Sequence, residues 1–167
     1  MAAKTSVEIG EVISAWTIRT ALVCYTLVLA QSLGGEWIST ANRRLVWTSG
    51  WLLYMAHAIA AFHYYHHWSH VAAIHHTAER TREITGLDWG GGLYLNYTFG
   101  AVWAADVVWC WSWPKNYAGR PKQITLGLHA FMLLIAVNAV IVFESGPLRW
   151  AGIAAVAWLL VTWYRNR

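Results

Sequence analysis

The stretch LVWTSGWLLYMAHAIAAFHYY, residues 45–65, contains no Asp, Glu, Lys, Arg or Pro. It is as long as the roughly 20 apolar residues that a helix needs to cross the hydrocarbon core of a bilayer. A soluble helix of similar length would carry charged residues along its water-facing side. The stretch therefore predicts a transmembrane helix.

The composition of the 167-residue chain agrees with a membrane protein. Hydrophobic residues make up 57% and charged residues 12% of the sequence, whereas soluble domains carry about 25% charged residues. The 13 Trp and 8 Tyr residues are amphipathic rings of the kind that collects at bilayer interfaces. The net charge of +4 comes from basic residues scattered between apolar runs, so we expect no binding to nucleic acid.

Apolar runs along the chain predict an all-α, polytopic membrane helix bundle that forms one transmembrane domain over residues 1–167. Five spans are expected at about 12–34, 45–70, 93–113, 124–143 and 148–164. The last run is the shortest, so four spans are the alternative. The second run continues without proline, and its helix is expected to extend beyond the bilayer to Gly86.

Lys and Arg are distributed unequally between alternate connections. With five spans, one side carries Arg43, Arg44, Lys115, Arg120, Lys122, Arg165 and Arg167, and the other carries Lys4, Arg80, Arg82 and Arg149. The positive-inside rule assigns the richer side to the cytoplasm. The N-terminus and the projecting helix are then expected to face outward from a bacterial inner membrane or its equivalent, with the C-terminus in the cytoplasm.

Six of the eight histidines lie between residues 63 and 76, and four of them form the pattern HxxHHxxH: His63, His66, His67 and His70. On a continuous helix these four occupy one face about 100° wide. They form two i,i+4 pairs, a spacing that lets two imidazoles on a helix bind one metal. We expect this face to point into the bundle, since it continues into the membrane as Leu52, Ala56, Ile59 and Ala60.

The histidine face predicts a site for a transition metal (Fe, Cu or Zn) held by His63, His66, His67 and His70. Glu11 and Glu144 are the expected carboxylate ligands from other helices. Haem held by one of the clustered histidines is the alternative cofactor. Such a site would suit a redox-active or metal-dependent membrane enzyme that acts on a lipid-like substrate.

Two other functions fit the same sequence. In a metal-ion or proton transporter, the histidines would form an outer loading site. In a small structural subunit of a larger membrane complex, the Trp-rich faces would bind partner membrane subunits or form an oligomer. The histidines would then only form hydrogen bonds.

Three further polar residues lie within apolar runs: Arg19, Asp106 and His129. Burying an ion in hydrocarbon is costly, so such residues face the interior of a bundle and have partners there. Asp106 and His129 are expected at similar depth, which predicts a hydrogen bond between them. Arg19 lies nearer the outer end and is expected to reach Glu144 or the histidines.

The strings HYYHH (residues 63–67) and HVAAIHH (residues 70–76) loosely resemble the histidine boxes of membrane desaturases and hydroxylases. In those enzymes spaced and doubled histidines hold iron. Their boxes lie on well-separated segments, whereas the two strings here are adjacent and no further box follows. The resemblance therefore does not assign the chain to that family.

Overall fold

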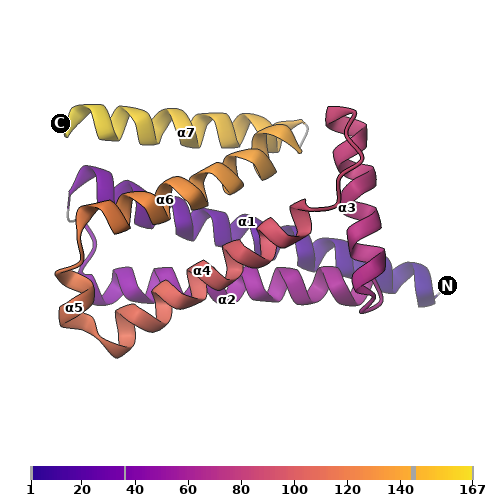
Figure 1. Ribbon diagram of the computed structural model, residues 1–167, viewed down its shortest axis with the longest axis horizontal. Helices are drawn as coiled ribbons and strands as arrows, with labels where there is room; N and C mark the ends of the chain where they lie inside the picture. Colours follow the sequence, from indigo (N-terminus) through magenta and orange to yellow (C-terminus); the bar gives the residue numbers. More distant parts are fainter. Residues whose placement is uncertain (1, 36, 144–145, 167) are drawn as a thin grey trace.

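The computed structural model describes residues 2–35, 37–143 and 146–166, and these residues contain helices and connections but no strand (Figure 1). The predicted all-α class is confirmed. The helices are α1 (Ala2–Gly34), α2 (Thr40–Tyr64), α3 (His70–Thr85), α4 (Gly92–Ser112), α5 (Pro114–Ala118), α6 (Lys122–Val137), the π-helical segment η1 (Asn138–Val142) and α7 (Pro147–Arg165).

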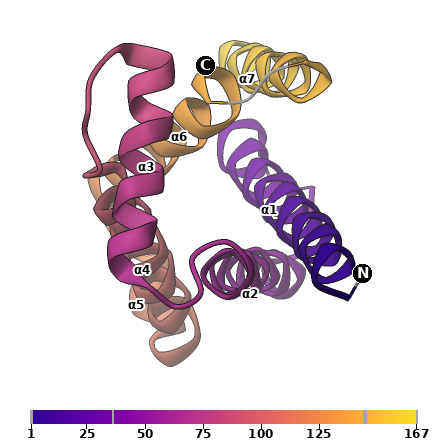
Figure 2. The same cartoon turned by 90° about the vertical axis from the view of Figure 1, so that its right-hand side faces the viewer.

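The long helices α1, α2, α4, α6 and α7 lie side by side and alternate in direction along the chain (Figures 1 and 2). They form a ring in which α1 packs along α2, α2 contacts α4, and α4 contacts α6. The ring closes through α7, which contacts both η1 and α1. The short helix α5 lies at one end of the bundle, and α3 lies across the other end (Figure 1).

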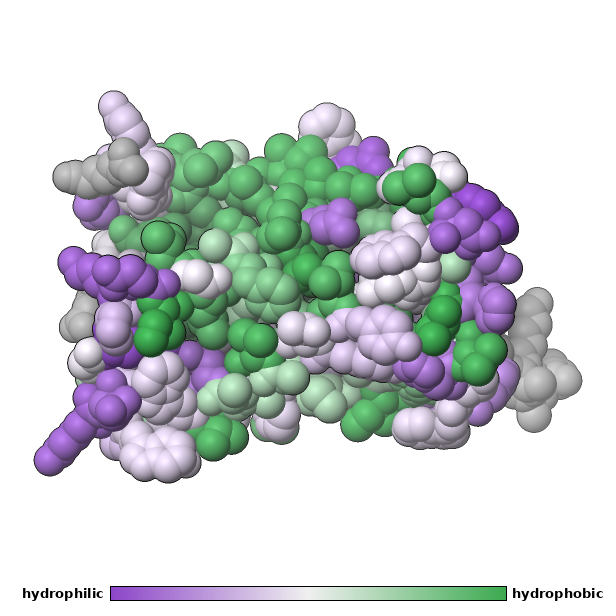
Figure 3. Space-filling model, viewed as in Figure 1, coloured by the Kyte–Doolittle hydropathy of each residue, from purple (hydrophilic) through white to green (hydrophobic). Residues whose placement is uncertain are grey.

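Three of the helical segments are long and apolar enough to cross a membrane: Glu8–Gly34, Thr40–Tyr64 and Lys122–Val142. The surface agrees with this property, because hydrophobic side chains form a broad band between two more hydrophilic ends (Figure 3). Such a band is stable against lipid and unfavourable in water. The described helices therefore indicate a membrane protein.

The expected continuous second helix is wrong. Helix α2 ends at Tyr64, and α3 begins only at His70. The two helices run roughly crosswise to each other (Figure 1). The segment that was expected to project from the bundle instead covers one end of it.

Aromatic side chains form the centre of the bundle. The side chains of Trp103, Tyr25 and Trp47 come from three helices and are almost completely buried. Their ring centroids lie 4.9 Å apart for Trp47 and Trp103, and 6.2 Å apart for Tyr25 and Trp103. Large rings at these distances bury much apolar area and also interact through their quadrupoles. They fix how α1, α2 and α4 pack together.

Two glycines permit close contacts in this arrangement. A Cβ atom on Gly50 of α2 would lie 2.7 Å from the ring of Trp103 and 3.0 Å from Cβ of Cys24. A Cβ atom on Gly90, in the link between α3 and α4, would lie 2.8 Å from the backbone oxygen of Ile74. The glycines thus let α4 and the end-covering helix α3 approach their neighbours.

The contact at Gly50 can be tested with Gly50→Ala. We expect this change to lower the free energy of unfolding by about 1–3 kcal/mol, because an added methyl group overpacks the core. The matched control is Gly127→Ala, since a Cβ at Gly127 of α6 meets no atom within 4 Å. That control should be neutral or stabilising by up to about 1 kcal/mol, through helix propensity. Equal unfolding free energies for the two variants in detergent would contradict the packing described.

Candidate functional site

The turn between α2 and α3, residues 65–69, positions most of the histidines. Ser69 ends the turn and caps α3, because its side-chain oxygen accepts a hydrogen bond from the backbone N–H of Ala72 at 3.2 Å. Serine is among the strongest N-capping residues. Inside the turn, the backbone N–H of Trp68 donates to the carbonyl of Phe62 at 2.9 Å. The chain therefore folds back onto the last turn of α2.

Two non-glycine residues in this turn have left-handed backbone conformations. The φ angles are 46° at His67 and 60° at Trp68. Such conformations cost roughly 1–2 kcal/mol for each L-residue. Backbone strain of this kind concentrates at binding sites and active sites. The strain at His67 and Trp68 thus marks the turn as a candidate functional element.

Because the helix breaks here, the predicted single face of His63, His66, His67 and His70 is wrong. His63 belongs to α2, His66 and His67 to the turn, and His70 to the first turn of α3. The expected inward orientation of this face is also wrong at Leu52 and Ile59, whose exposed fractions are 55% and 53%.

A different pair of histidines comes together at the turn. The ring centroids of His66 and His76 lie 5.3 Å apart. Burial lowers the pKa of His66, and the nearby His76 and His67 lower it further. The lowered pKa favours the neutral form of His66, in which imidazole can bind a metal. On a continuous helix His76 would lie far from His66 along the axis, so the sequence pattern did not indicate this pair.

His70 is held by two tyrosines from α4. Its Nδ1 lies 3.1 Å from the hydroxyl of Tyr97, and its Nε2 lies 3.4 Å from the hydroxyl of Tyr94. Tyr94 and Tyr97 are three residues apart on one helical face, so both hydroxyls can reach one ring. These contacts attach the start of α3 to the start of α4.

His63 and His67 are exposed, and the ring of His63 packs against Tyr64 and Trp68, with centroid distances of 4.7 and 6.1 Å. Among the residues that the structure describes, no group of three or more His, Cys, Asp or Glu side chains is placed to hold a metal ion. Of the histidine rings at this end of the bundle, those of His66 and His76 lie closest together.

The other predicted site residues near the histidines have separate environments. Glu11 is exposed on α1 and lies near Tyr65, whose pKa is raised by burial and by this carboxylate. The guanidinium of Arg19 lies over the ring of Trp16, 5.5 Å from its centroid. Glu144 lies outside the described residues. Glu11 therefore lies next to the turn between α2 and α3. The side chain of Arg19 instead packs against Trp16 of the same helix.

Asp106 forms the most enclosed polar contact of the described chain. One carboxylate oxygen accepts a hydrogen bond from Arg120 at 2.5 Å. The other accepts from Nε1 of Trp47 at 2.9 Å and from the hydroxyl of Tyr117 at 2.8 Å. The side chains of Asp106 and Arg120 are only 2% and 5% exposed. Burial and the Asp106 carboxylate raise the pKa of Tyr117, so its hydroxyl stays protonated and donates.

The predicted hydrogen bond between Asp106 and His129 is wrong. The oxygens of Asp106 bind Arg120, Trp47 and Tyr117, and neither ring nitrogen of His129 has a hydrogen-bond partner among the described residues. The ring of His129 instead packs against Tyr25 and Trp47, with centroid distances of 6.2 and 6.0 Å. No sequence pattern links Asp106 to Arg120, because their pairing depends on how α5 folds back.

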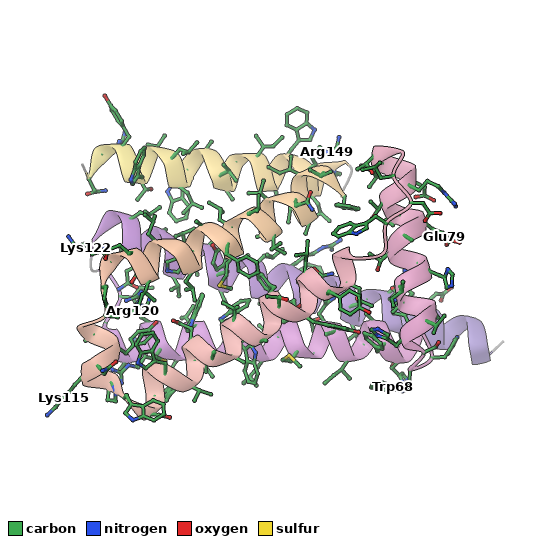
Figure 4. The ribbon with its side chains drawn as sticks, in the orientation of Figure 1. Trp68, Glu79, Lys115, Arg120, Lys122 and Arg149 are labelled. Atoms are coloured by element: carbon green, nitrogen blue, oxygen red, sulfur yellow. The ribbon has the colours of Figure 1, made fainter. Side chains whose placement is uncertain are left out.

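Comparison with protein-family models, with curated proteins and with solved structures finds no match. The class of this protein therefore follows from its own residues. Its helices indicate a membrane protein. The end covered by α3, where the rings of His66 and His76 lie 5.3 Å apart, we call the histidine end. The opposite end, at α5, carries Arg120 with Lys115 and Lys122 beside it, and we call it the arginine end (Figure 4).

The buried ion pair predicts a large effect for Asp106→Ala, which would leave the guanidinium of Arg120 buried without a counter-charge. We expect a loss of about 3–5 kcal/mol in the free energy of unfolding. The matched control is Glu83→Ala, which breaks the Arg80–Glu83 pair, whose side chains are 50% and 63% exposed. An exposed pair contributes less than about 1 kcal/mol. Equal losses for the two variants, measured by denaturant unfolding in detergent micelles, would refute the structural role of Asp106.

Strain in the turn predicts opposite effects of glycine at two neighbouring histidines. His67→Gly relieves a left-handed conformation, so stability should stay constant or rise by up to about 1 kcal/mol. His63→Gly places glycine in the last turn of α2 and should cost about 0.5–1 kcal/mol. Thermal unfolding of both variants measures the difference. A larger loss for His67→Gly than for His63→Gly would show that the turn has another conformation.

Proposed function

We propose that this protein is a five-span membrane protein that binds a transition metal at the histidine end. In this proposal the metal acts on an apolar, lipid-like molecule held in the adjoining groove between α2 and α4. The redox or metal-dependent chemistry expected from the sequence is retained, but the proposed ligands are different.

Five spans are supported by the arrangement of α4 and α7. These helices have 21 and 19 residues and lie alongside the three apolar segments. At 1.5 Å per residue each is about 30 Å long, which matches the hydrocarbon core of a bilayer. The arginine end would then be cytoplasmic by the positive-inside rule, and the histidine end would face outward.

The groove beside the histidines is the observation that carries the proposal. It has a volume of about 400 Å³ and lies between α2 and α4, with Phe62, Trp68 and Tyr97 at its histidine end. The ring of Phe62 is 5.5 Å from that of His66, and the hydroxyl of Tyr97 reaches His70. An alkyl chain entering from the lipid would therefore lie in the groove with its head beside the histidines.

Imidazole geometry supports His66 and His76 as ligands. Two imidazoles on one tetrahedral metal, with metal–nitrogen distances of about 2.0–2.1 Å, have ring centres about 5 Å apart. The separation of these rings is 5.3 Å. His67 is near enough to affect the pKa of His66, and its side chain is exposed. A bound transition metal would supply Lewis-acid or redox chemistry at the head of the groove.

Elemental analysis of the protein purified in detergent without chelator tests the metal site. We expect about one Fe, Cu or Zn ion per chain, with metal content falling to less than about a tenth in His66→Ala/His76→Ala because both proposed ligands are lost. The matched control is His75→Ala, which removes an exposed histidine from the same helix. His63→Ala should also retain the metal.

Equal metal loss in His75→Ala and in the double variant would contradict the assignment of ligands. Wild-type protein without any metal would favour the structural-subunit alternative, in which the exposed aromatic residues of α7 contact partner helices. Purification in mild detergent would then yield those partners in stoichiometric amounts.

A further inference from the structure

A second cavity lies at the arginine end of the bundle, away from the proposed metal site. Its volume is about 360 Å³, within the range of about 300–1,000 Å³ that is usual for small-molecule sites. It lies between the end of α1, the start of α2, α5 and the start of α6. Three arginines line it: Arg43, Arg44 and Arg120.

The charge in this cavity is strongly positive. Arg120 is neutralised by Asp106, but no acidic side chain is among the residues that line the cavity. Arg43 donates one hydrogen bond, to the hydroxyl of Ser32 at 3.0 Å. The guanidinium of Arg44 forms no hydrogen bond or ion pair within the described residues. Most of the N–H groups of these two arginines are therefore available to a ligand.

The walls of the cavity suit an oxyanion. Its lining includes the buried side chains of Val28, Trp47 and Cys110 and the exposed hydroxyl-bearing residue Thr40. A partly enclosed site with apolar lining residues strengthens the attraction between an arginine and an anion, because the local dielectric constant is low. Guanidinium groups also match the spacing of two oxygens on one phosphorus atom.

We propose that this cavity binds a phosphate group, which the guanidinium groups of Arg43 and Arg44 hold. The shared chemistry is a tetrahedral phosphorus with unesterified oxygens, as in a free phosphate or in the headgroup of an anionic phospholipid. The site is at the end of the bundle, where a lipid headgroup can reach it, and Lys115 and Lys122 lie at the same end outside its lining (Figure 4). This site is separate from the metal site and does not depend on it.

Titration calorimetry with inorganic phosphate and native mass spectrometry from nanodiscs test the two sources of phosphate. The nanodiscs contain either phosphatidic acid in phosphatidylcholine or phosphatidylcholine alone. We expect saturable binding of at least one phosphate probe to the wild type. Arg43→Gln/Arg44→Gln should weaken that binding by about 100-fold or more, because each arginine contributes charge-assisted hydrogen bonds.

The matched control is Lys115→Gln/Lys122→Gln, which removes the same charge from exposed positions outside the cavity lining. It should change affinity by less than about threefold, since exposed charges are screened by salt. Arg43→Lys/Arg44→Lys keeps the charge but removes the forked donors, and should weaken binding by at least about 10-fold. This variant also provides the test if the glutamine variant does not fold.

Binding of inorganic phosphate alone would identify a soluble phosphate as the ligand, and retention of phosphatidic acid alone would identify a lipid headgroup. Either result supports the proposal. Absence of saturable binding to both probes would overturn it. So would equal weakening in the arginine and lysine variants, because the effect would then be general surface charge.

Discussion

The burial of Asp106 is the constraint on which the arrangement of the arginine end depends. A carboxylate with 2% of its side chain exposed is stable only if neighbouring donors replace the water that it has lost. Those donors come from Trp47 on α2, Tyr117 on α5 and Arg120 after α5. The requirement to satisfy one carboxylate therefore fixes how α5 folds back and where α6 begins.

The same arrangement places the cavity at the arginine end. Trp47 and Arg120 both bind Asp106 and also line that cavity. Because Arg120 is occupied by Asp106, the positive charge available to a ligand comes mainly from Arg43 and Arg44. The ion pair of Asp106 and Arg120 thus stabilises this end of the bundle. The two arginines at the start of α2 are the residues proposed to bind phosphate.

At the histidine end, the break in the helix after Tyr64 determines which side chains meet. It brings His66 next to His76 and His70 next to the tyrosines of α4, contacts that a continuous helix could not form. Helices α2 and α4 connect the two ends and also form the walls of the apolar groove. The proposed lipid-like substrate would therefore lie between the elements that hold both polar sites in place.

The sequence was sufficient to predict the all-helical class, because long apolar runs have few alternatives in lipid. It was not sufficient to predict the break at residues 65–69, which contains neither glycine nor proline. Ser69 was the one local indication, as an N-cap residue before α3. The sequence also did not predict the hydrogen-bond partners of Asp106. Trp47 and Arg120 come from segments that are distant along the chain, and only tertiary packing brings them to Asp106.

The break in the second helix is the central structural claim, and a distance measured by pulsed electron paramagnetic resonance tests it most directly. Spin labels would replace the exposed residues Leu52 and Glu79, in protein whose Cys24 and Cys110 are changed to Ser. A continuous helix would separate these positions by about 40 Å. The crosswise α3 predicts about 20–25 Å, because helical segments of about 18 and 14 Å then meet near a right angle. A single distance near 40 Å would contradict the break and the pairing of His66 with His76.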